Sequence, residues 1–233
     1  RFVRFDCHLH TKSDKEFKYD DEENKFLERY INKLKEKEIN VGIITNHNKF
    51  NYNEFKNLKK KAIKDEIFLI PGVELSVKEG SNGLHVLIAF SEEWISNGND
   101  KINAFLDSAF INVTENRENE NTRCDYDLFH LIEALNRTQK DYFIIFAHVD
   151  QKSGIFYECD GGMISTLFNK NILREKTYGL QKSYNNDNYQ NFVNWTNMRL
   201  PRIEGSDPKC IDDIGKGNKK TYIKIGDYSF NTI

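Results

Sequence analysis

The chain has 233 residues, of which 38% are hydrophobic and 30% are charged, and its formal net charge is -2. This balance is typical of a core-forming globular protein, and it excludes the global basic field that drives nonspecific nucleic-acid binding. No run approaches the roughly 18 apolar residues that a membrane helix needs, and the opening RFVRF is too short and too charged for a signal peptide. The sequence therefore predicts a cytoplasmic protein without a membrane segment.

No internal repeat and no linker rich in Pro, Gly or Ser interrupts the chain, so we expect a single domain over residues 1–233. The chain begins at Arg1 without a methionine and stops just after the strand-like TYIKIGDYSF. We therefore expect it to be the N-terminal part of a longer protein. The cysteines lie far apart without C-x-x-C spacing, which favours reduced thiols over a four-cysteine zinc site. They are Cys7, Cys124, Cys159 and Cys210.

Short β-rich runs alternate with helical stretches along the chain. The alternating run RFVRFDC predicts a half-buried strand, and apolar residues at helical spacing in EENKFLERYINKLKEKEI predict an amphipathic helix. The polar stretch 112–127 predicts a loop. This alternation predicts an α/β fold with a largely parallel sheet or barrel. Further strands are expected at 41–45, 67–77, 84–90, 141–148, 177–182 and 201–207, and further helices at 51–66, 102–110, 125–137, 163–171, 189–197 and 211–216.

Most of the histidines, and two acidic residues, fall where predicted strands end. In an α/β fold the carboxyl ends of parallel strands meet at one edge, where the chemistry collects. His85 is a partial exception because it precedes most of its strand, and His130 lies in a predicted helix. The residues at strand ends are His8, His10, His47, Glu74, His148 and Asp207.

Imidazole and carboxylate groups together suit Zn²⁺, Mn²⁺ or Fe. With His85 the set holds seven candidate ligands, which suit two ions with Glu74 as a bridge better than they suit one. Two-metal sites activate a water molecule and clamp the oxygens of a phosphate ester. A single histidine beside a strand is more often a packed or surface residue than a ligand, and H-x-H alone is a weak signal. The shared position after separate strands is what favours a metal site.

Six motifs resemble, in order, those of the PHP (polymerase and histidinol phosphatase) family, from about Phe5 to Gly215. The resemblance implies a distorted seven-stranded (β/α) barrel with a two- or three-metal cluster at the C-terminal face. It also implies hydrolysis of phosphate esters, from small phosphomonoesters to the 3′ ends of nucleic acids. The motifs are DCHLHT, TNHN, IPGVELSV, LHVLIAF, FAHVD and EGSDPK.

The resemblance assigns metal ligands position by position. The ligands that it implies for a first ion are His8, His10, Glu74 and Asp207. The ligands that it implies for a second ion are Glu74, His85 and His148, so that Glu74 bridges the two ions.

The third metal site of the family is where this sequence departs from the pattern. The residues that correspond to it are Asp14, His47 and Lys209, because the chain reads SDPK where the family usually reads S-D-x-H. A protonated lysine cannot bind a metal ion. We therefore expect two divalent ions (Mn, Zn or Fe), with the Lys209 ammonium in place of the third ion and facing the phosphate. The alternative is a degraded third site with Lys209 in solvent.

Further catalytic and binding roles follow from the resemblance and from composition. Asp207 or a nearby histidine is the expected general base, and His47 and Lys209 are expected to face the phosphate oxygens or the leaving group. The basic and aromatic stretch NILREKTYGLQKSY, with Arg174 and Lys182, predicts contacts to a nucleic-acid strand. A strand edge with ordinary surface charges explains the same stretch equally well.

The leading hypothesis is a metal-dependent phosphoesterase that acts on nucleic-acid ends, with single-stranded DNA or RNA as substrate. The closing SDPK…IDDIGKG resembles PHP domains fused to AAA- or SMC-like ATPases, which suggests an ATPase domain in the same chain and a role in phage defence. One alternative is a small-molecule phosphatase of the histidinol-phosphate or nucleotide type. Another is a non-catalytic, structural metal-binding module, against which six intact ligand positions argue.

Overall fold

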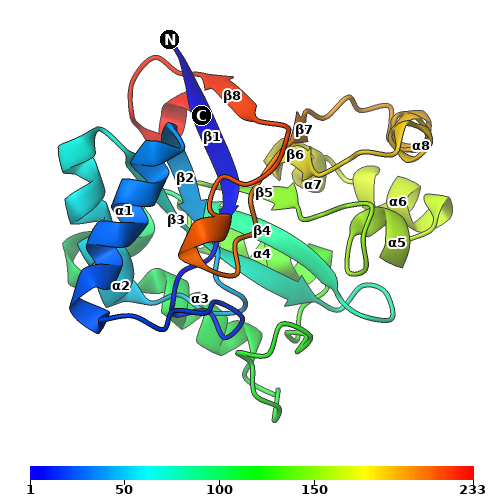
Figure 1. The fold of residues 1–233 in the computed structure, drawn as a ribbon. Helices are drawn as coiled ribbons and strands as arrows, with labels where there is room; N and C mark the ends of the chain where they lie inside the picture. The colour runs from blue at the N-terminus through cyan, green and yellow to red at the C-terminus, as the bar shows by residue number, and fades with distance from the viewer.

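A computed structural model describes residues 1–233, and one eight-stranded sheet forms its centre (Figure 1). The strand order is β7-β6-β5-β4-β3-β2-β1-β8. The strands are β1 (Phe2–Leu9), β2 (Ile39–Ile44), β3 (Phe68–Val77), β4 (Leu84–Phe90), β5 (Tyr142–Phe146), β6 (Thr177–Gln181), β7 (Arg202–Ile203) and β8 (Thr221–Lys224).

Pairing within the sheet is mixed. Strands β1, β2 and β3 pair in parallel, as do β5, β6 and β7, whereas β4 runs antiparallel to both of its neighbours. Where the sheet's two edges approach, the backbone N–H of Glu204, just after β7, donates to Oγ1 of Thr221 in β8 at 2.7 Å. The sheet is therefore a nearly closed barrel.

The barrel has eight strands, not the seven that the family resemblance implies. The extra strand, β8, pairs antiparallel with β1 and supplies partners for a strand edge that would otherwise expose unpaired backbone groups. Its residues alternate, with Tyr222 exposed and Ile223 packed against the interior of the barrel. The strand-like character of 221–230 was visible in the sequence, but its place beside the first strand was not.

Two hydrophobic cores lie on opposite faces of the curved sheet. The inner one consists of 14 buried residues, among them Val3, Phe5 and Cys7 of β1, and fills the barrel. The outer one consists of 47 buried residues and packs the sheet against the helices. Leu9 belongs to the outer core although strict alternation from Cys7 would place it inside, because the register of β1 shifts between Asp6 and Leu9.

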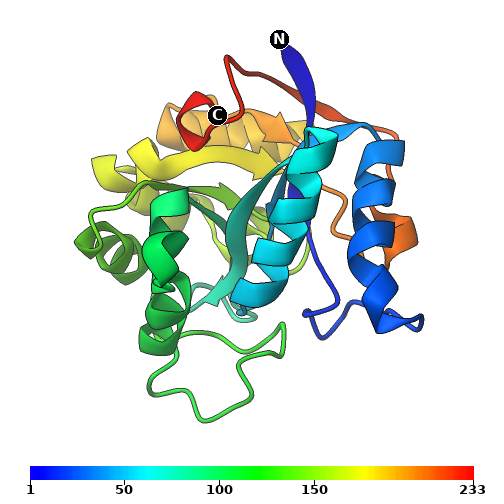
Figure 2. The ribbon, with the colours of Figure 1, turned by 90° about the vertical axis from the view of Figure 1, so that its left-hand side faces the viewer.

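The helices cover the outer face of the barrel. Figure 2 shows α1 and α2 side by side on one flank, where α1 buries Phe26, Tyr30, Ile31 and Leu34. The α-helices are α1 (Phe26–Glu36), α2 (Tyr52–Ala62), α3 (Lys101–Ala109), α4 (Leu128–Arg137), α5 (Ile155–Glu158), α6 (Gly161–Phe168), α7 (Asn171–Lys176) and α8 (Asn186–Thr196). Short 3-10 helices lie at Glu23–Lys25, Ile63–Asp65, Glu92–Gly98, Ile211–Asp213 and Phe230–Thr232.

The strands and longer helices expected from the sequence are confirmed, with shifted ends. Helices α5 and α7 were not predicted, and NILREK, expected as part of a strand edge or a nucleic-acid contact, forms α7. The stretch 112–127 has no helix or strand, as expected, and forms a loop that extends below the barrel in Figure 1. None of the helices combines the length and the apolar character that a bilayer crossing requires.

Candidate metal centre

Histidine side chains from separate strand ends converge on the carboxylate of Glu74, which lies in β3 and is 1% exposed. One oxygen, Oε2, lies 2.7 Å from Nε2 of His8 and 3.0 Å from Nε2 of His47. Nε2 of His10 is 3.4 Å from the same oxygen. We call these three imidazoles the Oε2 side of the cluster.

The other oxygen of Glu74 faces a second pair of imidazoles, the Oε1 side. Nδ1 of His85 lies 2.8 Å from Oε1, and Nε2 of His148 lies 3.2 Å from it. The remaining ring nitrogen of His85 contacts the backbone carbonyl of Glu120 at 3.1 Å, whereas Nδ1 of His148 is buried without a partner. Glu74 therefore lies between two separate groups of histidines.

Two aspartates complete the Oε2 side. Oδ1 of Asp207 lies 3.0 Å from Nε2 of His10 and 3.8 Å from Nε2 of His8. Oδ2 of Asp14 lies 3.1 Å from Nδ1 of His10 and 3.0 Å from Nδ1 of His47. The structure thus groups Asp14 and His47 with His10.

The end of β1 is fixed to the segment that follows β7. The carboxylate of Asp6 accepts hydrogen bonds from the backbone N–H of His8 at 3.1 Å and from both N–H and hydroxyl of Ser206, at 3.0 and 2.6 Å. Glycine is required at position 205, because a Cβ there would lie 2.7 Å from the Cβ of His8. Asp207 adopts a left-handed backbone conformation, with φ of 50°. These contacts place Asp207 beside the histidines.

Gln181 supports the cluster but carried no signal in the sequence beyond its place at the end of a predicted strand. It is fully buried, and its Oε1 accepts from Nδ1 of His8 at 2.9 Å and from the backbone N–H of His148 at 3.1 Å. Hydrogen bonds of this kind fix the ring orientation and the tautomer of a metal-binding histidine. Gln181 therefore connects the Oε2 and Oε1 sides.

The electrostatics of the cluster favour bound positive charge. Burial opposes ionisation of Glu74, but His47, His8 and His85 outweigh burial and lower its pKa well below the usual range. Asp14 also has a lowered pKa, because hydrogen bonds from His10 and His47 outweigh its burial. Conversely, burial opposes the charge of His47, but Glu74 and Asp14 raise its pKa to about 11. The carboxylates thus hold protons on imidazoles in the absence of another cation.

The donor set fits divalent metal ions. Nε2 of His8 and Nε2 of His10 lie 3.1 Å apart, and a shared cation would satisfy two lone pairs that face each other inside the protein. Imidazole and carboxylate donors are those that Zn²⁺, Mn²⁺ and Fe prefer. Three groups have ligand atoms within 4.8 Å of one another, namely His8 with His10 and Asp207, His10 with Asp14 and His47, and His47 with Glu74 and His85.

Lys209 lies at the rim of the cluster and is held by two carboxylates. Its ammonium is 2.6 Å from Oε2 of Glu16 and 3.1 Å from Oδ1 of Asp207, with 39% of the side chain exposed. Although burial opposes its charge, Asp207 and Glu16 raise the pKa of Lys209 above its usual value. Lys209 does not extend freely into solvent, and Glu16, which pairs with it, was not singled out in the sequence.

The two basic residues expected to bind substrate lie in different places. The ammonium of Lys182 is 3.9 Å from Oδ2 of Asp207, so it borders the cluster. Arg174 lies in α7, where its guanidinium donates to the carbonyls of Phe168 and Thr196 at 3.1 and 2.8 Å. It precedes the amino end of β6, whereas the cluster lies at the carboxyl end, so the structure does not bring Arg174 to the site.

Comparisons with solved structures identify the fold. The lesion-specific endonuclease PfuEndoQ from Pyrococcus furiosus superposes with a TM-score of 0.66 at 17% identity over 100% of this chain and 55% of its own. A two-domain protein from Bacteroides vulgatus, containing a predicted PHP-like metal-dependent phosphoesterase, gives 0.62 at 15% identity over 100% and 61%. A Bifidobacterium adolescentis protein described as a metal-dependent phosphoesterase gives 0.56 at 10% identity over 94% and 91%.

The chain thus spans little more than half the length of PfuEndoQ. No protein-family model and no curated protein matches it by sequence. At identities below 20%, these similarities establish a shared fold. The chain shares its barrel fold with these proteins.

Proposed function

We propose that this chain is a metal-dependent phosphoesterase whose two divalent ions are bridged by Glu74. The observation that carries the proposal is the division of the Glu74 carboxylate, with three imidazoles at Oε2 and two at Oε1. A buried carboxylate arranged in this way is suited to hold two cations side by side. The shared fold with PHP-like metal-dependent phosphoesterases supports the same reading.

The residues that would hold the ions divide along the two oxygens of Glu74. Two bound ions would supply a water molecule of lowered pKa and neutralise charge on the phosphate oxygens. Mn²⁺, Zn²⁺ and Fe are the candidate ions, in line with the donors. The proposed ligands are His8, His10, Glu74 and Asp207 for one ion and Glu74, His85 and His148 for the other, with Asp14 and His47 as further ligands on the Oε2 side.

Asp207, His47 and Lys209 are the proposed catalytic groups around the substrate. Asp207 contacts His10, Lys209 and Lys182, and its side chain is 19% exposed, so it can accept a proton from water as general base. The ammonium of Lys209 would bind a phosphate oxygen in place of a third ion. Lys182 would bind the phosphate on the other side of Asp207.

We propose nucleic-acid ends as the substrate, because the fold is shared with a lesion-specific endonuclease and because lysines border the cluster. A DNA or RNA strand would contact Lys182 and Lys209 through its phosphates. Linkage to an ATPase domain and a role in phage defence stay predictions from the resemblance of the closing motif, as does a cytoplasmic location.

One panel of substrates tests this function. We expect the metal-loaded protein to hydrolyse single-stranded oligonucleotides faster than soluble phosphomonoesters, and the His148→Ala variant to lose the activity while keeping its melting temperature. Preference for monoesters would favour a small-molecule phosphatase. Hydrolysis that persists in both His148→Ala and Glu74→Ala would refute the assignment. A protein that binds the ions but hydrolyses none of the substrates would favour a structural metal-binding module.

A further inference from the structure

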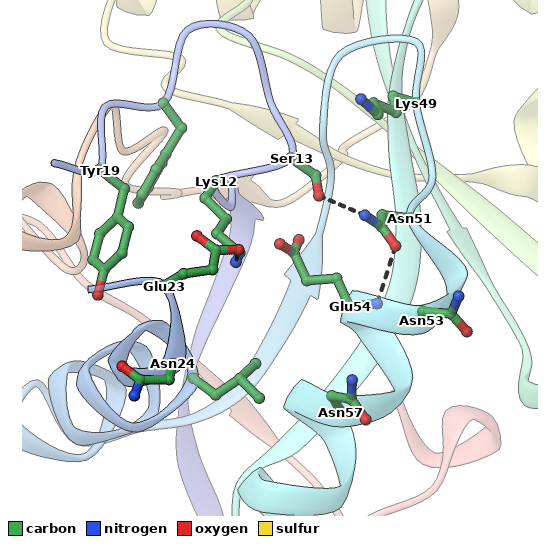
Figure 3. A pocket seen from close by; sticks show the side chains of 12 residues that line it. Lys12, Ser13, Tyr19, Glu23, Asn24, Lys49, Asn51, Asn53, Glu54 and Asn57 are labelled. Carbon is green, nitrogen blue, oxygen red and sulfur yellow. Dashed lines mark hydrogen bonds and ion pairs between the residues drawn. The ribbon is translucent and has the colours of Figure 1, made fainter. Parts of the chain in front are cut away.

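A polar cavity of about 700 Å³ lies beside the metal centre and is not part of it (Figure 3). It is bordered by the segment that follows β1 and by the first turns of α2. Cavities of this size are typical of small-ligand sites. Both bordering segments follow the carboxyl ends of parallel strands, so the cavity belongs to the same end of the barrel as the cluster.

Glu54 of α2 lines this cavity and has one oxygen without a hydrogen-bond partner. It is 8% exposed, and its Oε1 accepts a hydrogen bond from the hydroxyl of Thr11. Its other oxygen, Oε2, is buried without a partner. In Figure 3 the carboxyl group points from α2 toward Lys12 and Ser13. A buried carboxylate oxygen without a partner costs free energy, which a ligand N–H would recover.

A short hydrogen-bond network separates Glu54 from the metal centre. The side chain of Asn46 accepts from the backbone N–H of Thr11 at 2.8 Å and donates to the hydroxyl of Thr11 at 2.9 Å. Thr11 directly follows His10, and Asn46 directly precedes His47. A ligand bound at Glu54 therefore lies one layer of side chains away from the histidines of the Oε2 side.

The charges around the cavity exclude a metal ion or a free phosphate as its natural ligand. The ammonium of Lys12 pairs with Glu23, and that of Lys49 pairs with Glu118 at 2.9 Å, so neither lysine is left uncompensated. A single buried carboxylate is too few ligands for a tightly held divalent ion. The cavity is therefore suited to a neutral molecule that forms hydrogen bonds.

The remaining wall offers amides and apolar surface. The exposed residues Asn24, Asn53 and Asn57 line the cavity, and Phe17 and Leu27 contribute apolar surface. Amide side chains match the adjacent donor and acceptor of a base edge, and a carboxylate accepts from an exocyclic amino group. A planar, neutral ring that carries an amino group could pair with the amides and the carboxylate and could pack against the apolar surface.

We infer that this cavity is a binding site for a nucleobase, with Glu54 as acceptor for a base N–H and the asparagine amides along the base edge. The base could belong to the substrate or to a free nucleoside that binds beside the centre. Binding itself does not depend on the proposed phosphoesterase function, whereas recognition of substrate through this site rests on it.

Free nucleosides test the site without any hydrolysis. Adenosine, cytidine and guanosine would be titrated calorimetrically into the 233-residue chain in the presence of a chelator, and at least one should bind saturably. Glu54→Gln keeps an acceptor for Thr11 but turns the unpaired carboxylate oxygen into an amide donor, so it should weaken binding at least about tenfold. Asn57→Ala should weaken it less, and Lys60→Ala, an exposed change on the same helix, should leave it unchanged.

Kinetics then distinguish the two sources of the base. If the base belongs to the substrate, Glu54→Gln raises KM for nucleotide substrates and leaves hydrolysis of p-nitrophenyl phosphate unchanged. If a free nucleoside is the ligand, adding it changes the rate on p-nitrophenyl phosphate in the unaltered protein but not in Glu54→Gln. The inference is overturned if no nucleoside binds, or if Glu54→Gln and Asn57→Ala both bind it as tightly as the unaltered protein does. Either result would count against the site even where metal-dependent hydrolysis is intact.

Discussion

The two sides of the Glu74 carboxylate are built differently. On the Oε2 side a polar side chain lies within 3.1 Å of the second nitrogen of every ring, Gln181 for His8 and Asp14 for both His10 and His47, although the approach of Asp14 to His10 lacks hydrogen-bond geometry. On the Oε1 side, His85 is held by the backbone carbonyl of Glu120, which belongs to a loop, and Nδ1 of His148 has no partner.

This difference predicts unequal metal affinity. Partners that fix ring orientation raise the affinity of a metal site, and rings that must be ordered on binding lower it. The backbone of the loop that carries Glu120 is held by the amide of Asn48, which donates to the carbonyls of Arg117 and Thr122 at 2.9 Å each, while further side chains of the loop form ion pairs at the surface. We therefore expect a chelator to remove the ion on the Oε1 side first.

The largest expected effect comes from Glu74→Gln, which removes the feature that both sides share. Both ions should be lost, and hydrolysis should fall by about three orders of magnitude or more, since the ions supply several kcal/mol of transition-state stabilisation. Metal analysis and initial rates would measure both changes. Glu79→Gln, a change at another buried glutamate, which caps the start of α4, is the matched control and should keep metal and activity. Normal metal content in Glu74→Gln would contradict the bridging role.

Substitutions of the supporting residues should affect the two sides unequally. Gln181→Met removes the partner of the His8 ring and of the His148 backbone N–H, so we expect metal affinity to fall about 10- to 100-fold on the Oε2 side and to fall less on the Oε1 side. Asn48→Ala frees the loop that holds His85, and we expect a loss of about tenfold confined to the Oε1 side, with faster hydrogen exchange in residues 117–122. Chelator titrations of both variants would measure this. Equal losses of both ions in Asn48→Ala would show that the two sides are not independent.

The smallest effect is expected at the rim. Lys209→Met removes the ammonium that lies between Glu16 and Asp207 but removes no metal donor. We expect kcat/KM to fall about tenfold, in line with the loss of one charged hydrogen bond to phosphate, while metal content stays at two ions per chain. Three tightly bound ions in the unaltered protein would contradict the assignment of Lys209 to the place of a third ion.

The convergence of the candidate ligands could be predicted because each position depends on a local pattern. A strand ends, and a histidine or an acid follows, as with His47 after β2 and His148 after β5. Parallel strands then bring these ends together whatever the details of packing. For the same reason the α/β class and most of the elements could be predicted, though not their ends, whereas the short helices α5 and α7 have too few residues to show a period.

The supporting contacts could not be predicted, because they join residues far apart in the chain. Ser206 and Asp6 are separated by 200 positions, and Gln181 and His8 by 173. Arg174 was assigned to substrate binding from the composition of its stretch alone. It lies in α7, before the amino end of β6, whereas the cluster lies at the carboxyl end.

The sequence by itself determined the residue types of the candidate metal centre, their order and the end of the barrel at which they meet, because strand ends and side-chain chemistry are local properties. Only the tertiary structure decided that Glu74 divides five imidazoles between its two oxygens, that β8 adds an eighth strand and that Glu54, which has one unpaired oxygen, lines a cavity. Those features depend on distances between elements, which the curvature and the packing of the barrel set.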